Sequence, residues 1–88
     1  MLSADGLMPG MATPAQMREL QQAAGRDRDI LFCRLMIRHH LGGIHMADAV
    51  LEQSDDPQVT ALARTVKDGQ QYDITVLQDR LKRLGAAP

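Results

Sequence analysis

Apolar residues recur with a helical period along two long stretches of the chain. No proline interrupts the span from Asp27 to Gln53, where apolar positions lie three or four residues apart and predict one helix: Leu31, Phe32, Leu35, Met36, Ile37, Ile44, Met46, Ala47, Val50 and Leu51. A second periodic series begins after Asp56 and Pro57, an N-cap and a first helical residue, and continues to Leu84. Because the linker between them is so short, the two helices are expected to be antiparallel neighbours.

A shorter helix is expected before this hairpin. Thr13 can cap it, Pro14 suits its first position, and Gln16 can reach back to complete a capping box. The predicted helix covers residues 14–24 and ends at Gly25. Residues 1–12 are rich in Met and Gly without apolar periodicity, and are interpreted as a flexible arm. Residues 13–88 are expected to form a single helical domain.

The composition supports an all-α fold that needs a second layer. Of the 88 residues, 44% are hydrophobic and only 2% are aromatic, and the abundant residue types favour helix. A chain this short has a small core. Two long helices and a short one cannot cover each other's apolar stripes, so a homodimer that completes a four-helix bundle is predicted.

Charge and motif content exclude several functions. Ten basic and eleven acidic residues are spread along the chain, so nucleic acid is not expected as a partner. No apolar run could span a bilayer, and residues 1–11 lack a signal-peptide pattern. The serines, Ser3 and Ser54, fall in the arm and the turn, and there is no phosphate-binding glycine loop. An enzyme is therefore not expected.

A polar layer is predicted inside the hairpin. Helical geometry places His39 and His40 on the inward side of the first long helix and Gln70 and Asp73 on that of the second. If the hairpin turns near residue 55, His40 should face Gln70. Two glycines, Gly42 and Gly43, interrupt the first helix at this height, which indicates a close backbone approach or a helix supported by tertiary contacts.

Two interpretations of this layer remain open. In the structural one, hydrogen bonds between His, Gln and Asp fix the helix register, and Asp73 orients a histidine. In the functional one, the two imidazoles, the thioethers of Met36 and Met46 and the Asp73 carboxylate bind a metal. Imidazole with thioether suits copper or silver, and imidazole with carboxylate suits zinc or iron. Adjacent histidines project about 100° apart, so His40 with Met36, or His39 with Met46, is the easier pair.

Other residues have simpler explanations as well as functional ones. A flexible soft-metal trap could involve the remaining methionines, Met1, Met8, Met11 and Met17, although Met17 also fits the apolar face of the short helix. Cys33 lies on the inward stripe and is expected to be an inert core residue rather than a reactive thiol. His45 falls on the opposite face and is expected to be solvated.

The segment MIRHHLGGIHMA, residues 36–47, resembles the histidine-pair motif of the ferritin-like domain of unknown function family 305. Gly25 and Asp29 upstream, and the Gln-x-x-Asp-Ile pattern at residues 70–74, extend the resemblance over residues 13–84. It implies a ferritin-like bundle, typical of periplasmic, secreted or membrane-anchored bacterial proteins, some of them associated with copper. The residues it points to are Met36, His39, His40 and Met46, with Gln70 and Asp73 facing them.

The chain departs from the family pattern in three ways. Family domains commonly contain two helix pairs, and this chain has one, which implies half of such a domain completed by a partner copy. Leu41 replaces the Gln or Glu that often follows the histidines, and Arg38 replaces a usual Pro. A di-iron oxidase is disfavoured because the chain contains no Glu-x-x-His sequence. The rival to metal binding is a structural or interaction module.

Overall fold

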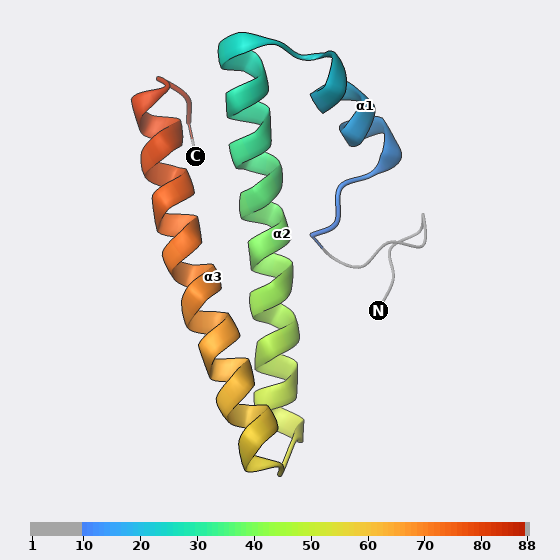
Figure 1. The fold of residues 1–88 in the computed structure, drawn as a ribbon, viewed down its shortest axis with the longest axis vertical. Helices are drawn as coiled ribbons and strands as arrows, with labels where there is room; N and C mark the ends of the chain where they lie inside the picture. Colours follow the sequence, from blue (N-terminus) through green and yellow to red (C-terminus); the bar gives the residue numbers. More distant parts are fainter. Residues whose placement is uncertain (1–9, 88) are drawn as a thin grey trace.

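The computed structural model describes residues 10–87, which form three helices and no strand. They are α1 (Pro14–Gln22), α2 (Gly25–Gln53) and α3 (Pro57–Arg83). The predicted all-α class and helical hairpin are confirmed, and α2 and α3 lie side by side and antiparallel (Figure 1). Most of the predicted arm, including Met1 and Met8, lies outside the described residues.

Two helix starts form as the sequence predicts. Thr13 and Gln16 make a complete capping box, in which Gln16 N donates to Thr13 Oγ1 over 3.0 Å and Thr13 N donates to Gln16 Oε1 over 2.8 Å. At α3, Asp56 Oδ1 accepts hydrogen bonds from the backbone N–H groups of Gln58 and Val59. These bonds satisfy N–H groups that have no partner within the helix, and they also fix where each helix begins.

The predicted junction between α1 and α2 is wrong by two residues on each side. α1 ends at Gln22, and Ala23 and Ala24 are extended. Gly25 begins α2 instead of ending α1, with a left-handed φ of +59°. Because glycine tolerates this conformation at little cost, it redirects the chain from the extended linker directly into α2.

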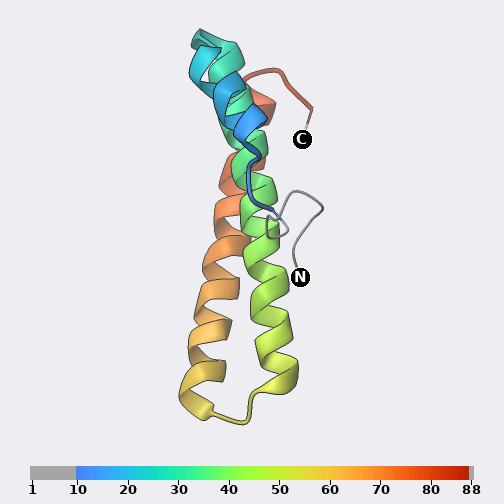
Figure 2. The ribbon, with the colours of Figure 1, turned by 90° about the vertical axis from the view of Figure 1, so that its right-hand side faces the viewer.

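The helices form a layer that is only one helix thick. The molecule measures 46 × 31 × 16 Å, and an α-helix with its side chains is about 10–12 Å across. α1 contacts α2 on the side away from α3, so the three helices lie in one sheet-like layer, seen edge-on in Figure 2. The described residues that are buried come from the α2–α3 contact, and they are Cys33, His40, Ala47, Ala63 and Leu81. The two broad faces of the layer are therefore open.

Two arginines of α2 hold the chain where α3 ends. Arg26 Nε donates to the carbonyl oxygen of Leu84 over 2.7 Å, and Arg34 Nη2 donates to that of Ala87 over 3.1 Å. Because α3 ends in carbonyls without helical partners, these cations suit its C-terminus electrostatically as well. Within residues 10–87, no helix has both the length and the apolar character needed to cross a membrane.

Candidate functional site

His40 is a buried imidazole with acceptors at both ring nitrogens. Its side chain comes from the middle of α2 and is 8% exposed. Nδ1 lies 2.8 Å from the carbonyl oxygen of Met36, and Nε2 lies 3.0 Å from Asp73 Oδ2 on α3. A neutral imidazole has one N–H, and Nδ1 uses it on the carbonyl. The contact with Asp73 therefore needs a second proton, which the two groups share.

The predicted pairing of His40 with Gln70 is wrong by three residues along α3. His40 contacts Asp73, and the side chain of Gln70 lies against Gly43 instead. The connection, residues 54–56, is centred on residue 55 as predicted. His40 nevertheless lies opposite Asp73 and Gly43 opposite Gln70, so both facing pairs are shifted by three residues, nearly one helical turn.

The prediction that both histidines lie on the inward side of the hairpin is wrong for His39, which is exposed and points away from His40 into an open groove. The two rings are 6.0 Å apart between centroids and inclined at 72°, as expected for adjacent residues on a regular helix. His39 is exposed, and it lines a groove of about 520 Å³ together with Met46 from the same side of α2. The other lining residues are Met11, Gly43, Ala47, Val50, Val59, Leu62, Ala63, Val66 and Gln70.

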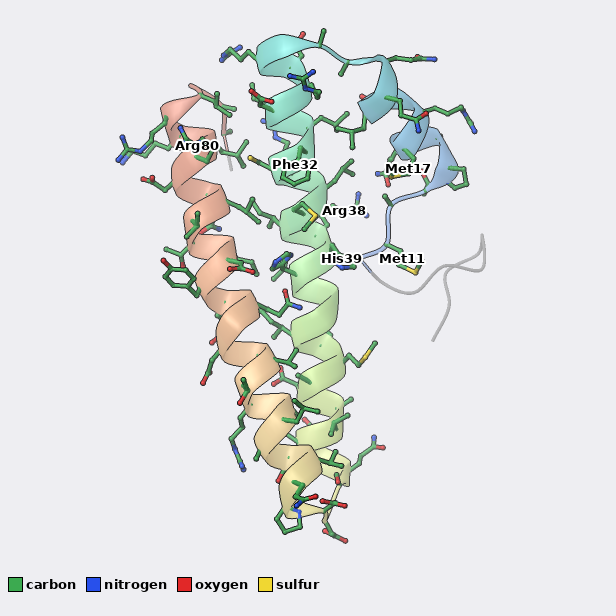
Figure 3. All side chains as sticks on the ribbon, viewed as in Figure 1. Met11, Met17, Phe32, Arg38, His39 and Arg80 are labelled. Atoms are coloured by element: carbon green, nitrogen blue, oxygen red, sulfur yellow. The ribbon has the colours of Figure 1, made fainter. Side chains whose placement is uncertain are left out.

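The groove joins an imidazole with two thioethers. The predicted pairing of His39 with Met46, seven residues apart, is consistent with this groove because both residues line it. Met11 lines the same groove, and Figure 3 shows it beside the part of α2 that carries His39, whereas Met17 lies further along on α1. Met36 differs from the prediction, since its contact with His40 uses the backbone carbonyl oxygen rather than the sulfur.

The two glycines of α2 explain how Met11 reaches the groove. Gly10 has a φ of +87°, and a β-carbon built on it would collide with the carbonyl oxygen of Arg38 and lie 3.1 Å from the Cα of Gly42. A β-carbon on Gly43 would lie 2.8 Å from Gln70 Nε2. Gly42 therefore receives the arm, and Gly43 makes room for Gln70. The glycine pair predicts a close approach at this height of α2. Nothing in the sequence pattern places Met11 in one site with His39.

The remaining candidates do not join this groove. Nowhere in residues 10–87 do three His, Cys, Asp or Glu side chains converge as they would around a metal held by those residue types alone. Cys33 is buried, and its burial and the nearby Asp29 carboxylate raise the pKa of its thiol above the ordinary 9.0. The predicted place of Cys33 in the core is confirmed, and its low reactivity stays a prediction. His45 is exposed and is not among the groove residues.

Comparisons with known proteins agree on one family. The family model described as Domain of unknown function (DUF305) matches residues 1–81. A crystal structure of a DUF305 protein from Streptomyces coelicolor, described as a candidate secreted protein, is 36% identical in sequence with a TM-score of 0.86. The match covers 91% of this chain and 50% of that one, so this chain spans about half the length of its structural relative. No curated protein matches the chain.

Proposed function

This chain belongs to the DUF305 family, and on that premise we propose that it is a non-catalytic protein that binds copper as Cu(I) through Met and His side chains. The observation that carries the proposal is that the side chains of Met11, His39 and Met46 line one groove. Imidazole and thioether together form a soft ligand set, which suits Cu(I) and silver better than zinc or iron.

The surroundings of these three side chains favour a monovalent soft ion. The groove is otherwise lined by aliphatic residues and glycine, with Gln70 as the other polar side chain. Met46 is 55% exposed and Met11 44%, so both thioethers can be reached from solvent. A low-charge site of this kind does not supply the carboxylates and multiple imidazoles that zinc or iron usually takes.

The contact between His40 and Asp73, outside the groove, also supports metal binding. A histidine that ligates a metal through Nε2 commonly donates its Nδ1–H to a backbone carbonyl, and His40 has this arrangement with Met36. Nε2 then faces a carboxylate oxygen at 3.0 Å, and a cation would bind both groups by replacing the proton that they share. We propose this pair as an auxiliary position next to the groove, with Met36 orienting its imidazole.

The test is a competition titration of metal-free protein with Cu(I) under reducing conditions. Met46→Leu and Met11→Leu remove a thioether at nearly constant volume, and each should weaken Cu(I) binding by about tenfold or more. Met17→Leu is the matched control, since Met17 is equally exposed as Met11 but is not part of the groove. His39→Gln and His45→Gln form the corresponding histidine pair. Equal affinities in groove and control variants would refute the proposal.

A structural module is the second candidate, and one observation favours it. Among the described residues, no buried side-chain nitrogen or oxygen lacks a hydrogen-bond partner, so His40 is already satisfied by Met36 and Asp73. In that case the polar layer would only fix the register of α2 on α3. A well-folded protein that binds no Cu(I) in the titration would favour this candidate.

Assembly and location belong to the same proposal. We propose that the chain acts as a homodimer and is exported from the cytoplasm, to the periplasm, the exterior or a membrane anchor. Export is supported by the description of the Streptomyces relative as a candidate secreted protein. Fractionation of the native host, with an antibody against this chain, would test it, and recovery only in the cytoplasm would refute it.

A further inference from the structure

We propose that a second copy of this chain covers one broad face of the hairpin, with a two-fold axis that runs through the height of His39 perpendicular to the helices. The face, called here the groove face, consists of Phe32, His39 and Met46 on α2 and Val59, Leu62, Val66 and Val76 on α3. The groove face includes His39 and Met46 of the proposed copper site, but the pairing of two copies needs no metal.

The groove face is apolar and open in the single chain. Leu62 is 64% exposed, and the other aliphatic and aromatic members of the face are all more than 40% exposed. Globular domains pack two or more layers around their core, and this molecule has one layer, 16 Å thick. Within its 46 × 31 Å outline there is room for the roughly 800 Å² that each partner buries in a standard interface.

The groove face is self-complementary about His39. Phe32 and Met46 lie seven residues to either side of His39, which places all three on one line of α2 at steps of about 10.5 Å. His39 is also the central residue of Gly25–Gln53. A two-fold axis at this height therefore brings the His39 side chains of the two copies together and places Phe32 of each copy against Met46 of the other.

The groove face differs in shape between its two ends, and this favours an antiparallel arrangement of the helices of the two copies. Beyond Met46, toward the α2–α3 connection, the face is hollowed by the groove, which is lined there by Val50, Val59 and Leu62. At the other end Phe32 is 48% exposed, on α2 in Figure 3. A perpendicular two-fold axis places each Phe32 over the partner copy's groove. An axis along the hairpin would stack like ends and leave two hollows facing each other, contrary to close packing.

The length of the structural relative agrees with a second copy as the occupant. This chain aligns with half of the Streptomyces protein over 91% of its own length, so the relative carries about as much chain again as the part that matches. The part of this chain that matches, taken twice, accounts for the length of that protein. The two-fold arrangement supplies the second layer from an identical helical hairpin.

The first experiment is sedimentation equilibrium of the metal-free protein in the presence of a chelator. The wild type should be a dimer, and Leu62→Glu should shift it to monomer by placing a charge on the apolar part of the groove face near the α2–α3 connection. Leu41→Glu is the matched control, because Leu41 is 43% exposed but lies on the far side of α2 from His39. A monomeric wild type, or dissociation by both variants alike, would overturn the inference.

Cross-linking fixes the orientation and does not depend on whether Leu62→Glu folds. In a Cys33→Ala background, Phe32→Cys and Met46→Cys proteins are prepared separately, mixed, and treated with a short bis-maleimide. The mixture should give a cross-linked dimer and each protein alone should not, because like positions would be about 21 Å apart along the helices. Cross-linking of Phe32→Cys alone, or none in the mixture, would contradict the proposed axis. Both experiments are free of copper, so they can fail independently of the Cu(I) titration.

Discussion

The side-chain amide of Gln70 lies against Gly43, so closely that a β-carbon on Gly43 would come within 2.8 Å of Gln70 Nε2. The two residues sit at the centre of the α2–α3 contact, next to the pair formed by His40 and Asp73. Gly43 is thus retained in a helix interior that would otherwise favour alanine. The contact makes the cost of replacing this glycine depend on the residue at position 70.

Gly43→Ala should behave differently in two backgrounds. In the wild type, the gain of about 1 kcal/mol in helix propensity is opposed by the displacement of Gln70, and the free energy of unfolding should change little or fall. In a Gln70→Ala background the added methyl no longer meets the Gln70 amide, and Gly43→Ala should raise the free energy of unfolding by about 0.5–1 kcal/mol. Denaturant unfolding of the four proteins measures this coupling. Additive effects would contradict the contact.

The double variant His39→Leu, His40→Leu should keep the fold and lose Cu(I). Asp73, whose side chain is 56% exposed, stays solvated without its partner, so the loss of its contact with His40 should cost little stability. The thermal midpoint of the metal-free protein should therefore fall little or rise. His45→Leu is the control for the loss of an exposed imidazole. A loss of about 3 kcal/mol in the double variant would mean that the polar layer is needed for folding.

Gly10→Ala should weaken Cu(I) binding without weakening the hairpin. The new methyl group would meet the backbone of Arg38, which cannot move without disturbing α2, so the arm and Met11 should leave the groove. The affinity should fall as far as in Met11→Leu, with little change in the thermal midpoint. Gly25→Ala is the control: it also has a positive φ but no neighbour within 4 Å, and should cost about 1 kcal/mol of stability with affinity unchanged. The reverse pattern would refute this account of the arm.

Cys33 should react slowly with alkylating reagents in the folded protein. Its thiol is buried and its raised pKa keeps the thiolate fraction low at neutral pH. Iodoacetamide labelling at pH 7.5 should be much slower in the native protein than in guanidinium. Equal rates would contradict the burial of this side chain.

The same raised pKa predicts how stability depends on alkaline pH. The folded state holds the Cys33 proton more tightly than the unfolded state, so the thiol's contribution is complete below the ordinary pKa of 9.0 and is lost as the pH rises through the folded value. The free energy of unfolding should decline above about pH 9 more steeply in the wild type than in Cys33→Ala. A parallel decline would contradict the assignment to Cys33.

Helix period, caps and linker length were sufficient to predict the all-α hairpin. Asp56 and Pro57 give an unambiguous start for α3, and Thr13 with Gln16 does the same for α1. The facing partner of His40 was not predictable in the same way. Register depends on the path of the chain through residues 54–56, and periodicity within each helix is unchanged when one helix slides by about a turn.

The candidate site was predicted in part for a similar reason. The helical period of α2 correctly places His39 and Met46 on one side and separates His39 from His40. The participation of Met11 depends on how residues without periodicity fold back, and in the structure this is determined by Gly10 and its fit against Gly42. A glycine pair in a helix indicates that another segment packs closely there, but it does not predict which segment this is.

The thinness of the layer has a consequence for how the protein responds to concentration. With five of the described residues buried and both broad faces open, one chain alone has little apolar interior to oppose its conformational entropy. When folding and pairing are linked in this way, the midpoint of unfolding rises with the amount of protein present. If the proposed pairing supplies the second layer, dilution should therefore unfold this chain, and its folded fraction should depend on how many copies its compartment holds.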